Sequence, residues 1–212
     1  RSNKEKFSEI YEKNLWSSIE SGSGEGSELA YTNNLRTWLI EMLAQYKVQK
    51  LVDAACGDFN WMRFVLPDLE LEYRGFDIVE SVIRGNKTKY SNKDTHFGVA
   101  DICNDQLPDC DVLMVRDCLF HLSFKDINKF LENLNRVNYK ILLTTSHRTK
   151  HAFSNKDIST GDFRCLDIFK SPLSFDPASV IERFQEPSRG GMARDMVMIK
   201  KENVPTSLKE QI

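Results

Sequence analysis

The 212-residue sequence has few prolines, few glycines and no long apolar run. Its six Pro and ten Gly exclude a collagenous or low-complexity chain. The apolar stretch at residues 112–115 is interrupted by Arg116, and no segment approaches the roughly 20 apolar residues that span a bilayer. We therefore expect a protein without membrane insertion.

An excess of charge of one sign is also missing. The 29 Lys and Arg residues nearly balance the 31 Asp and Glu residues, which gives a formal net charge of −2. Without a dense Lys/Arg cluster, no strong field draws the protein to nucleic acid or to an anionic membrane. We expect a small-molecule partner and no nucleic-acid partner, and the oligomeric state is left open.

Cysteine pairs of the C-x-x-C type are absent. The five cysteines are odd in number and widely spaced, which favours reduced thiols over a disulfide or zinc framework. This usage predicts an intracellular, cytoplasmic protein.

Apolar residues make up 41% of the chain and charged residues 28%, enough for one globular domain with a small appendage. The appendage is residues 1–28, in which apolar residues at helical spacing predict a helix over about the first sixteen positions. The loop that follows, residues 21–27 (SGSGEGS), is either a flexible linker or a lid over a binding site. Residues 29–212 form the main domain.

In the main domain, strands and helices alternate along the chain. Such a pattern predicts a Rossmann-like α/β fold: a doubly wound, mostly parallel seven-stranded sheet with a C-terminal antiparallel hairpin and an N-terminal helical extension. The strands are expected at residues 50–56, 71–79, 95–102, 111–115, 140–145, 180–184 and 195–200. Helices are expected at residues 29–46, at 61–65, where Pro67 stops the helix, and after a capping box at residues 123–126.

Carboxylates follow four consecutive predicted strands. Asp53, Asp77, Asp101 and Asp117 each stand at the carboxyl end of a strand, which is where ligands bind in a sheet of this kind. A single Asp at such a position is usually a turn or helix cap. Four of them along one edge predict a binding site.

The spacing of Asp77 indicates the type of ligand. It follows Gly57 by 20 residues, as does the acidic residue that accepts hydrogen bonds from both ribose hydroxyls in nucleotide-binding folds. However, Ala55 and Phe59 replace the other glycines of a pyrophosphate-binding turn, and Asp58 would repel a phosphate. A cationic, phosphate-free nucleoside such as S-adenosylmethionine is therefore favoured over NAD.

The segments VDAACGD, FD at Asp77, VADI at Asp101 and DVLMVRDCLFHLS resemble the ordered motifs of class I S-adenosylmethionine-dependent methyltransferases. The resemblance extends from about residue 29 to the end, although only one glycine of the usual glycine-rich loop is present. SGSGEGS, CGDFNW and GDFRCLDI are similar to segments of small bacterial methyltransferases linked to surface-polysaccharide or secondary pathways.

The resemblance implies a role for each strand end on the cofactor side. Asp53 and Gly57 would lie near the methionine moiety, with Asp53 facing its ammonium. Asp77 would hold the ribose and Ile78 would lie against the adenine. The ordinary alternative for Asp53 is a turn residue.

The next two strand ends would complete the site. Asp101 would accept a hydrogen bond from the adenine amino group, with Ile102 beside the ring. Arg116 and Asp117 would form the floor of the acceptor site. Alternatively, the isoleucines are core residues and Arg116 pairs with a nearby carboxylate.

Methyl transfer to a hydroxyl also requires a base. His121 is the first candidate, because it follows Asp117 by four residues and imidazole titrates near neutral pH. His147, after the fifth strand, is the second candidate, and a packing role for His121 remains open. A further alternative is a divalent metal bound by Asp117, His121 and His147, although no local ligand motif supports it.

The acceptor is expected to be a polar small molecule methylated on oxygen, or less readily on nitrogen. The bacterial relatives imply a sugar or a phosphoryl or phosphoramidate group of a surface-polysaccharide precursor. Arg148, Lys150 and Arg164 are candidates to meet an anionic acceptor. An NAD-linked oxidoreductase and a noncatalytic nucleoside-binding module remain alternatives.

Overall fold

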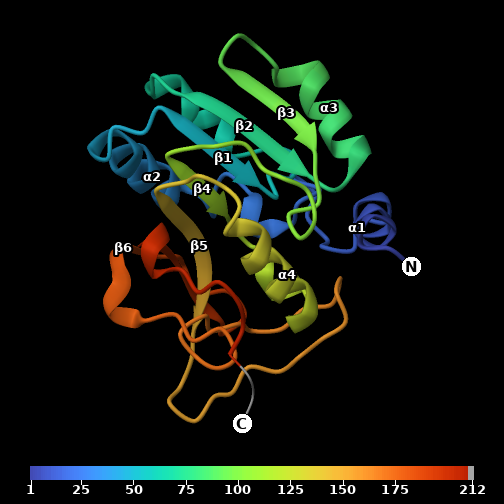
Figure 1. Cartoon of the computed structure of the whole chain (residues 1–212). Helices are drawn as coiled ribbons and strands as arrows, with labels where there is room; N and C mark the ends of the chain where they lie inside the picture. The colour runs from blue at the N-terminus through green and yellow to red at the C-terminus, as the bar shows by residue number, and fades with distance from the viewer. Residues whose placement is uncertain (210–212) are drawn as a thin grey trace.

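The computed structural model describes residues 1–209, which fold around one seven-stranded sheet (Figure 1). Its strand order is β3-β2-β1-β4-β5-β7-β6. The strands are β1 (Lys50–Ala54), β2 (Glu72–Asp77), β3 (Thr95–Val99), β4 (Val112–Val115), β5 (Ile141–Arg148), β6 (Val180–Gln185) and β7 (Ala193–Lys200).

The sheet confirms the fold predicted from the sequence. Strands β1 to β5 pair in parallel, whereas β7 runs antiparallel to both β5 and β6. The order reverses at β1, because β2 and β3 lie on one side of it and β4 and β5 on the other. A crevice for a ligand is expected beyond the carboxyl ends of β1 and β4, next to this switch point.

Alternating side chains along the strands build two separate cores. Val52 and Leu113 pack on one face with helix α4, and Leu51 and Met114 pack on the other with α2 and α3. Burial on both faces explains the continuous apolar runs that identified these strands. The helices are α1 (Asn3–Glu12), α2 (Asn33–Gln45), α3 (Glu80–Tyr90) and α4 (Phe124–Leu134).

Helix α4 begins where the sequence predicted. The Ser123 hydroxyl accepts a hydrogen bond from the Asp126 N–H at 3.2 Å and so caps the first turn. The predicted helix at residues 61–65 is wrong, since this stretch forms the short 3₁₀ turns Met62–Phe64 and Leu66–Asp68. Pro67 lies within the second turn and stops the chain from continuing as an α-helix.

Helix α3 was not predicted, because it lacks an apolar stripe. Only Ile83 and Asn86 of this helix are buried. Asn86 anchors it instead through a polar contact, since its side-chain amide donates to the Gly57 carbonyl at 2.8 Å. The helix therefore packs against the turn after β1 and helps to fix that turn.

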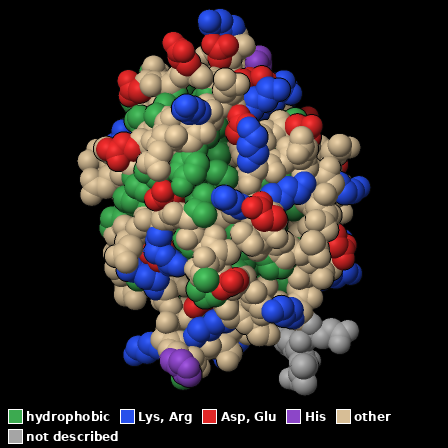
Figure 2. Space-filling view, turned by 60° about the vertical axis from the view of Figure 1, so that its left-hand side comes forward, with side chains coloured by type: hydrophobic (Ala, Val, Ile, Leu, Met, Phe, Trp, Pro, Cys, Tyr) green, Lys and Arg blue, Asp and Glu red, His purple; other side chains and the backbone are tan. Residues whose placement is uncertain are grey.

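The surface carries charges of both signs. On the face that Figure 2 shows, Lys and Arg side chains are interspersed with Asp and Glu, and apolar side chains gather near the middle. Among residues 1–209, no helix has the length and apolar character that a membrane crossing requires.

Candidate active site

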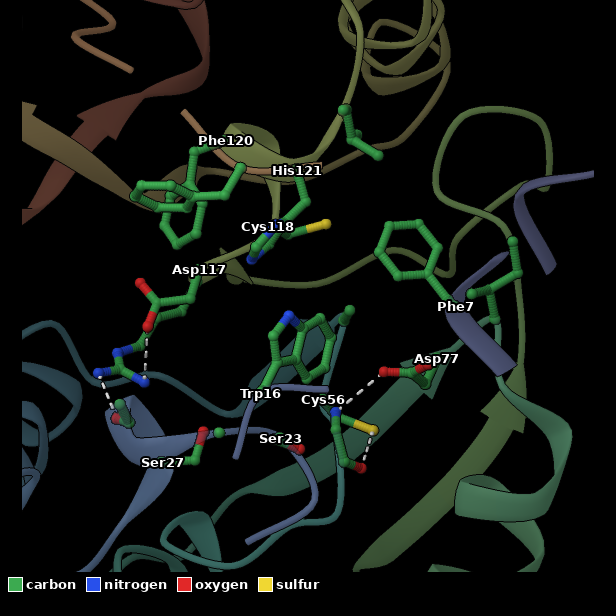
Figure 3. Close-up of a pocket in the computed structure, with 18 of the residues that line it drawn as sticks. Phe7, Trp16, Ser23, Ser27, Cys56, Asp77, Asp117, Cys118, Phe120 and His121 are labelled. Carbon is green, nitrogen blue, oxygen red and sulfur yellow. Dashed lines mark hydrogen bonds and ion pairs between the residues drawn. The ribbon is translucent and has the colours of Figure 1, made fainter. Parts of the chain in front are cut away.

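A cavity of about 390 Å³ opens at the carboxyl ends of the parallel strands (Figure 3). Helix α1 and the loop after it close one side of this cavity, and the β6–β7 hairpin closes another. The lining includes the predicted cofactor and catalytic residues Asp53, Gly57, Asp77, Ile78, Asp101, Ile102, Arg116, Asp117, His121 and His147, but not Arg148, Lys150 or Arg164.

Asp77 holds the turn after β1 and also borders the cavity. One of its carboxylate oxygens accepts from the Gly57 N–H at 3.1 Å and the other from the Val79 N–H at 3.0 Å. Burial raises the pKa of Asp77 to about 6, against the effect of these backbone donors. Each oxygen keeps a further lone pair with which it can accept from a ligand hydroxyl.

The pKa of Asp53 is raised further than that of Asp77. It is 3% exposed and its Oδ2 accepts from the Tyr73 hydroxyl at 2.7 Å. Burial raises the pKa of Asp53 to about 7, although the Tyr73 bond and the charge of Arg116 oppose the rise. A cation placed in the cavity beside Asp53 would be stabilised by the ionised form of this group.

The end of β3 supplies a third carboxylate. Asp101 accepts from the Cys103 N–H at 2.9 Å and from the Asn104 side-chain amide at 2.7 Å, which fixes its orientation. Ile78 and Ile102 line the cavity on the same side and give it an apolar wall.

Asp58, which was expected to repel a phosphate, does not line the cavity and instead binds the loop after α1. Its carboxylate accepts from the Ser21 hydroxyl at 2.9 Å, the Gly22 N–H at 2.9 Å and the Ser23 hydroxyl at 3.2 Å. The segment of residues 21–27, hereafter the strap, is thereby fastened to the turn after β1.

The strap and helix α1 reach into the site. The Ser23 hydroxyl lies within hydrogen-bond distance, 2.8 Å, of the Tyr11 hydroxyl and accepts from the Asp58 N–H at 3.0 Å. Figure 3 shows Trp16 and Phe7 pointing into the space between Asp77 and His121. Residues 1–28 thus form a wall of the cavity.

A buried ion-pair network closes the opposite side. Arg116 donates to Glu186 at 2.7 Å and to the Gly26 carbonyl at 2.9 Å, and Arg194 lies 2.6 Å from Glu186 and 2.8 Å from Asp117. Arg116 therefore takes the paired role that was the alternative prediction. Glu186 and Arg194 were not predicted, because the segments that follow β4 and β6 and the start of β7 come together only in the folded chain.

Asp117 is ionised within this network. Burial alone would raise its pKa, but the adjacent Arg116 and Arg194 guanidiniums outweigh that effect and lower the pKa. Its backbone has a left-handed φ of 52°, held by the Thr145 hydroxyl, which accepts from the Asp117 N–H and donates to its Oδ1. A conformation of this kind persists only where the surroundings enforce it.

The tautomer of His121 is set by a backbone carbonyl. Its Nδ1 lies 2.8 Å from the Asp162 carbonyl, which can only accept, so Nδ1 carries the proton and Nε2 has a free lone pair. Burial lowers the pKa of His121 and keeps the ring neutral near pH 7. The Asp117 charge opposes this shift and favours uptake of a proton.

His147 is not arranged as a base, which corrects its place as second candidate. The Leu166 N–H donates to its Nδ1 at 3.1 Å, so the lone pair is used and the proton resides on Nε2. Burial, and then the charge of Arg194, lower the pKa of this imidazole. In this tautomer the Nε2–H can donate one hydrogen bond, and the ring has no further acceptor.

The described part of the chain contains no ligand cluster that would support the metal alternative. Within residues 1–209, no group of three or more His, Cys, Asp or Glu side chains has the geometry of a metal site. The arginines proposed for an anionic acceptor also lie elsewhere: Arg148 pairs with Asp195 at 3.1 Å, and Arg164 donates to the Leu122 carbonyl. The arginines that line the cavity are Arg116, Arg189 and Arg194.

Removal of the strap anchor provides a first test. We expect Asp58→Ala to increase amide hydrogen exchange in residues 20–28 at least about tenfold, because three hydrogen bonds to one carboxylate are lost. Hydrogen exchange with mass spectrometry measures this. Asp68→Ala, at an exposed carboxylate, is the control, and equal exchange in both variants would contradict the anchoring role.

The raised pKa of Asp53 predicts a pH dependence of stability. A carboxyl whose pKa is raised by folding stabilises the folded chain at pH values below about 4. This contribution is lost as the pH rises through about 7. The side chain of the Asp53→Asn variant stays neutral. Between about pH 5 and pH 8, the free energy of unfolding of this variant should therefore fall less than that of the wild type, by on the order of 2–4 kcal/mol. Urea unfolding measures both slopes, and parallel slopes would contradict the shift.

The sequence matches no protein-family model and no curated protein. Solved structures do share its fold. Magnesium protoporphyrin IX methyltransferase (ChlM) from Synechocystis PCC 6803 with bound SAM superposes with a TM-score of 0.63 at 11% identity, covering 95% of this chain and 98% of that chain.

Two further structures are similar. The N-methyltransferase NodS from Bradyrhizobium japonicum WM9 in complex with S-adenosyl-L-homocysteine gives a TM-score of 0.64 at 12% identity, covering 92% of this chain and 97% of that one. The [4+2]-cyclase SpnF gives 0.57 at 14% identity, with coverage of 77% and 80%. At such identities the likeness establishes the fold, and the chemistry has to be argued from the cavity.

Proposed function

We propose that this protein is an S-adenosylmethionine-dependent methyltransferase. The observation that carries the proposal is the row of carboxylates Asp53, Asp77 and Asp101, which three adjacent parallel strands bring into one cavity. Structural neighbours that hold SAM or its product in the same fold support it.

The residues around the cavity fit the nucleoside part of this cofactor. Asp77 is fixed by two backbone donors and retains lone pairs for the two ribose hydroxyls. Ile78 and Ile102 would contact the adenine ring, and Asp101 would accept from its amino group.

The methionine part would lie near Asp53. This carboxyl is buried with a single hydroxyl donor, so an ammonium group beside it would supply the missing positive partner. Gly57 borders the same region, and its left-handed φ of 58° shapes the turn. Binding of the ammonium group would then favour the ionised form of Asp53, which would release its proton.

The turn after β1 does not suit a pyrophosphate. The Gly57 N–H already donates to Asp77, and Phe59 packs against Tyr73 and Phe97 with ring centroids 5.1 Å and 5.0 Å away. The turn therefore presents no row of free amides to a diphosphate, which favours the methyl donor over NAD.

When bound, S-adenosylmethionine supplies an electrophilic methyl group and a good leaving group. The chain then has to orient the acceptor and remove its proton. The Asp162 carbonyl holds the His121 ring through Nδ1–H, which leaves Nε2 to take the hydroxyl proton. The ionised Asp117 favours the positive charge that His121 acquires.

The acceptor is proposed to be a small molecule methylated on oxygen. The identification of the acceptor as a sugar or phosphoryl group of a bacterial surface-polysaccharide precursor rests on the sequence resemblance alone. Each arginine of the cavity has a carboxylate partner: Arg116 with Glu186, Arg194 with Asp117 and Arg189 with Glu25. An anionic acceptor would have to compete with these pairs, so a neutral one is favoured.

Cofactor binding tests the proposal directly. We expect calorimetry to detect S-adenosylhomocysteine binding, and Asp77→Ala to weaken it at least about tenfold, because the ribose loses its acceptors. Asp94→Ala, at an exposed carboxylate on the opposite end of β3, is the matched control, with melting temperatures to verify folding. NADH binding in place of S-adenosylhomocysteine would support the oxidoreductase instead.

The base is tested by His121→Asn, whose amide can still donate to the Asp162 carbonyl but has no equivalent of Nε2. We expect S-adenosylhomocysteine binding to persist and the rate of labelled methyl transfer to fall by about 10²–10⁴-fold. The wild-type rate should fall with decreasing pH only below about 6.5, because the pKa of His121 is lowered, and the variant should lack this limb.

A panel of sugars, polyols, catechols and phosphoryl compounds with labelled donor, analysed by mass spectrometry, supplies the acceptor for this assay. Cofactor binding without transfer to any member of the panel would favour the noncatalytic module.

A further inference from the structure

His147 is a buried imidazole of the cavity lining whose Nε2 has no hydrogen-bond partner among residues 1–209. It is 4% exposed and lines the cavity, and its Nδ1 is occupied by the Leu166 N–H. Within residues 1–209, no hydrogen bond involves its Nε2–H. His147 Nε2 is not among the buried unpaired side-chain atoms of residues 1–209, so this N–H is accessible and can donate a hydrogen bond to a ligand in the cavity.

His121 presents the opposite polarity. Because its Nδ1–H is held by the Asp162 carbonyl, its outer nitrogen is an acceptor. Two neutral imidazoles of the same cavity therefore offer one acceptor and one donor. A ligand that satisfies both needs a hydroxyl and a second oxygen.

Aromatic rings connect the two histidines. The Phe120 ring lies 4.6 Å from His121 and 5.1 Å from His147, and the Phe163 ring lies 6.0 Å and 6.1 Å from them. The Trp16 ring lies 5.4 Å from His121 on the side of helix α1. These rings form a wall along which a flat or ring-shaped ligand can stack.

Phe163 is a partly uncovered ring of this wall. Its side chain remains 47% exposed although it lines the cavity beside Phe120 and both histidines. An aromatic face at a cavity is covered when a ring stacks on it, with either an aromatic ring or the C–H face of a sugar as partner.

We propose that the acceptor is a neutral ring bearing oxygens on two adjacent carbons, one of which donates to His121 Nε2 and is methylated while its neighbour accepts from His147 Nε2–H. This inference rests on the proposed function and names its substrate class. The acceptor oxygen forms the bond to the methyl carbon, the methyl–sulfur bond breaks with its electron pair on sulfur, and the proton passes to His121. A catechol and a sugar diol share this chemistry.

The tautomers are tested first and do not depend on activity. In ¹⁵N-histidine-labelled protein, long-range ¹H–¹⁵N spectra at pH 7.5 should show His121 protonated on Nδ1 and His147 on Nε2. His121→Asn and His147→Asn assign the signals. If His147 carries its proton on Nδ1, the inference is overturned.

Binding is then measured on the protein saturated with S-adenosylhomocysteine. Catechol is compared with phenol, and methyl α-mannopyranoside with its 2-deoxy analogue, by titration of the His147 Nε2 signal. We expect at least one diol to bind about tenfold more tightly than its partner that lacks the second oxygen. The pair that shows this difference identifies the ring as aromatic or saturated.

Matched variants separate recognition from a structural role. His147→Asn can still accept from the Leu166 N–H but loses the outer donor, whereas His147→Gln retains a donor near that position. The first should abolish the tenfold preference for the diol, and the second should preserve part of it. His96→Asn, on the exposed side of β3, is the control.

The outcomes distinguish the two proposals. If S-adenosylhomocysteine does not bind, the proposed function fails. If it binds but neither diol is preferred over its deoxy partner, or if His147→Asn keeps the preference, the cofactor assignment stands and the acceptor class is wrong.

Discussion

The parallel direction of β1 to β4 is the constraint on which the site depends. Because each strand ends at the same edge of the sheet, Asp53, Asp77, Asp101 and Asp117 share one cavity although about twenty residues separate each from the next. Their environments then differentiate them. Burial raises the pKa of Asp53, whereas two guanidiniums lower the pKa of Asp117, so one edge offers carboxyls of unlike character.

The buried charges of the acceptor side are balanced within the protein. Arg116, Glu186, Arg194 and Asp117 form a network of two cations and two anions that joins the end of β4 to the hairpin strand β7. Removing one member would leave a buried charge without a partner, which is far less favourable than retaining the network. The network therefore fixes the position of Asp117 and leaves little free positive charge for a ligand.

The strand ends could be predicted from the sequence because periodicity reports burial and parallel topology then dictates where each strand stops. The contacts across the cavity could not. The pairing of Asp58 with residues 21–23 and that of Arg194 with Asp117 join distant segments without a local pattern. Likewise, the different roles of His121 and His147 follow from which backbone group meets each Nδ1, and a sequence does not encode that visibly.

The glycines of the strap are explained by contact rather than by freedom to move. A Cβ at Gly26 would lie 2.5 Å from an Arg194 nitrogen and 3.0 Å from Asp117. A Cβ at Gly57, in the turn after β1 that the strap contacts, would lie 2.2 Å from the Ser23 hydroxyl oxygen. A Cβ at either position would have to displace these side-chain atoms, and Gly57 also has a left-handed φ of 58°, so glycine suits both positions. The strap therefore packs closely against the turn expected to hold the cofactor and against the charged network of the acceptor side.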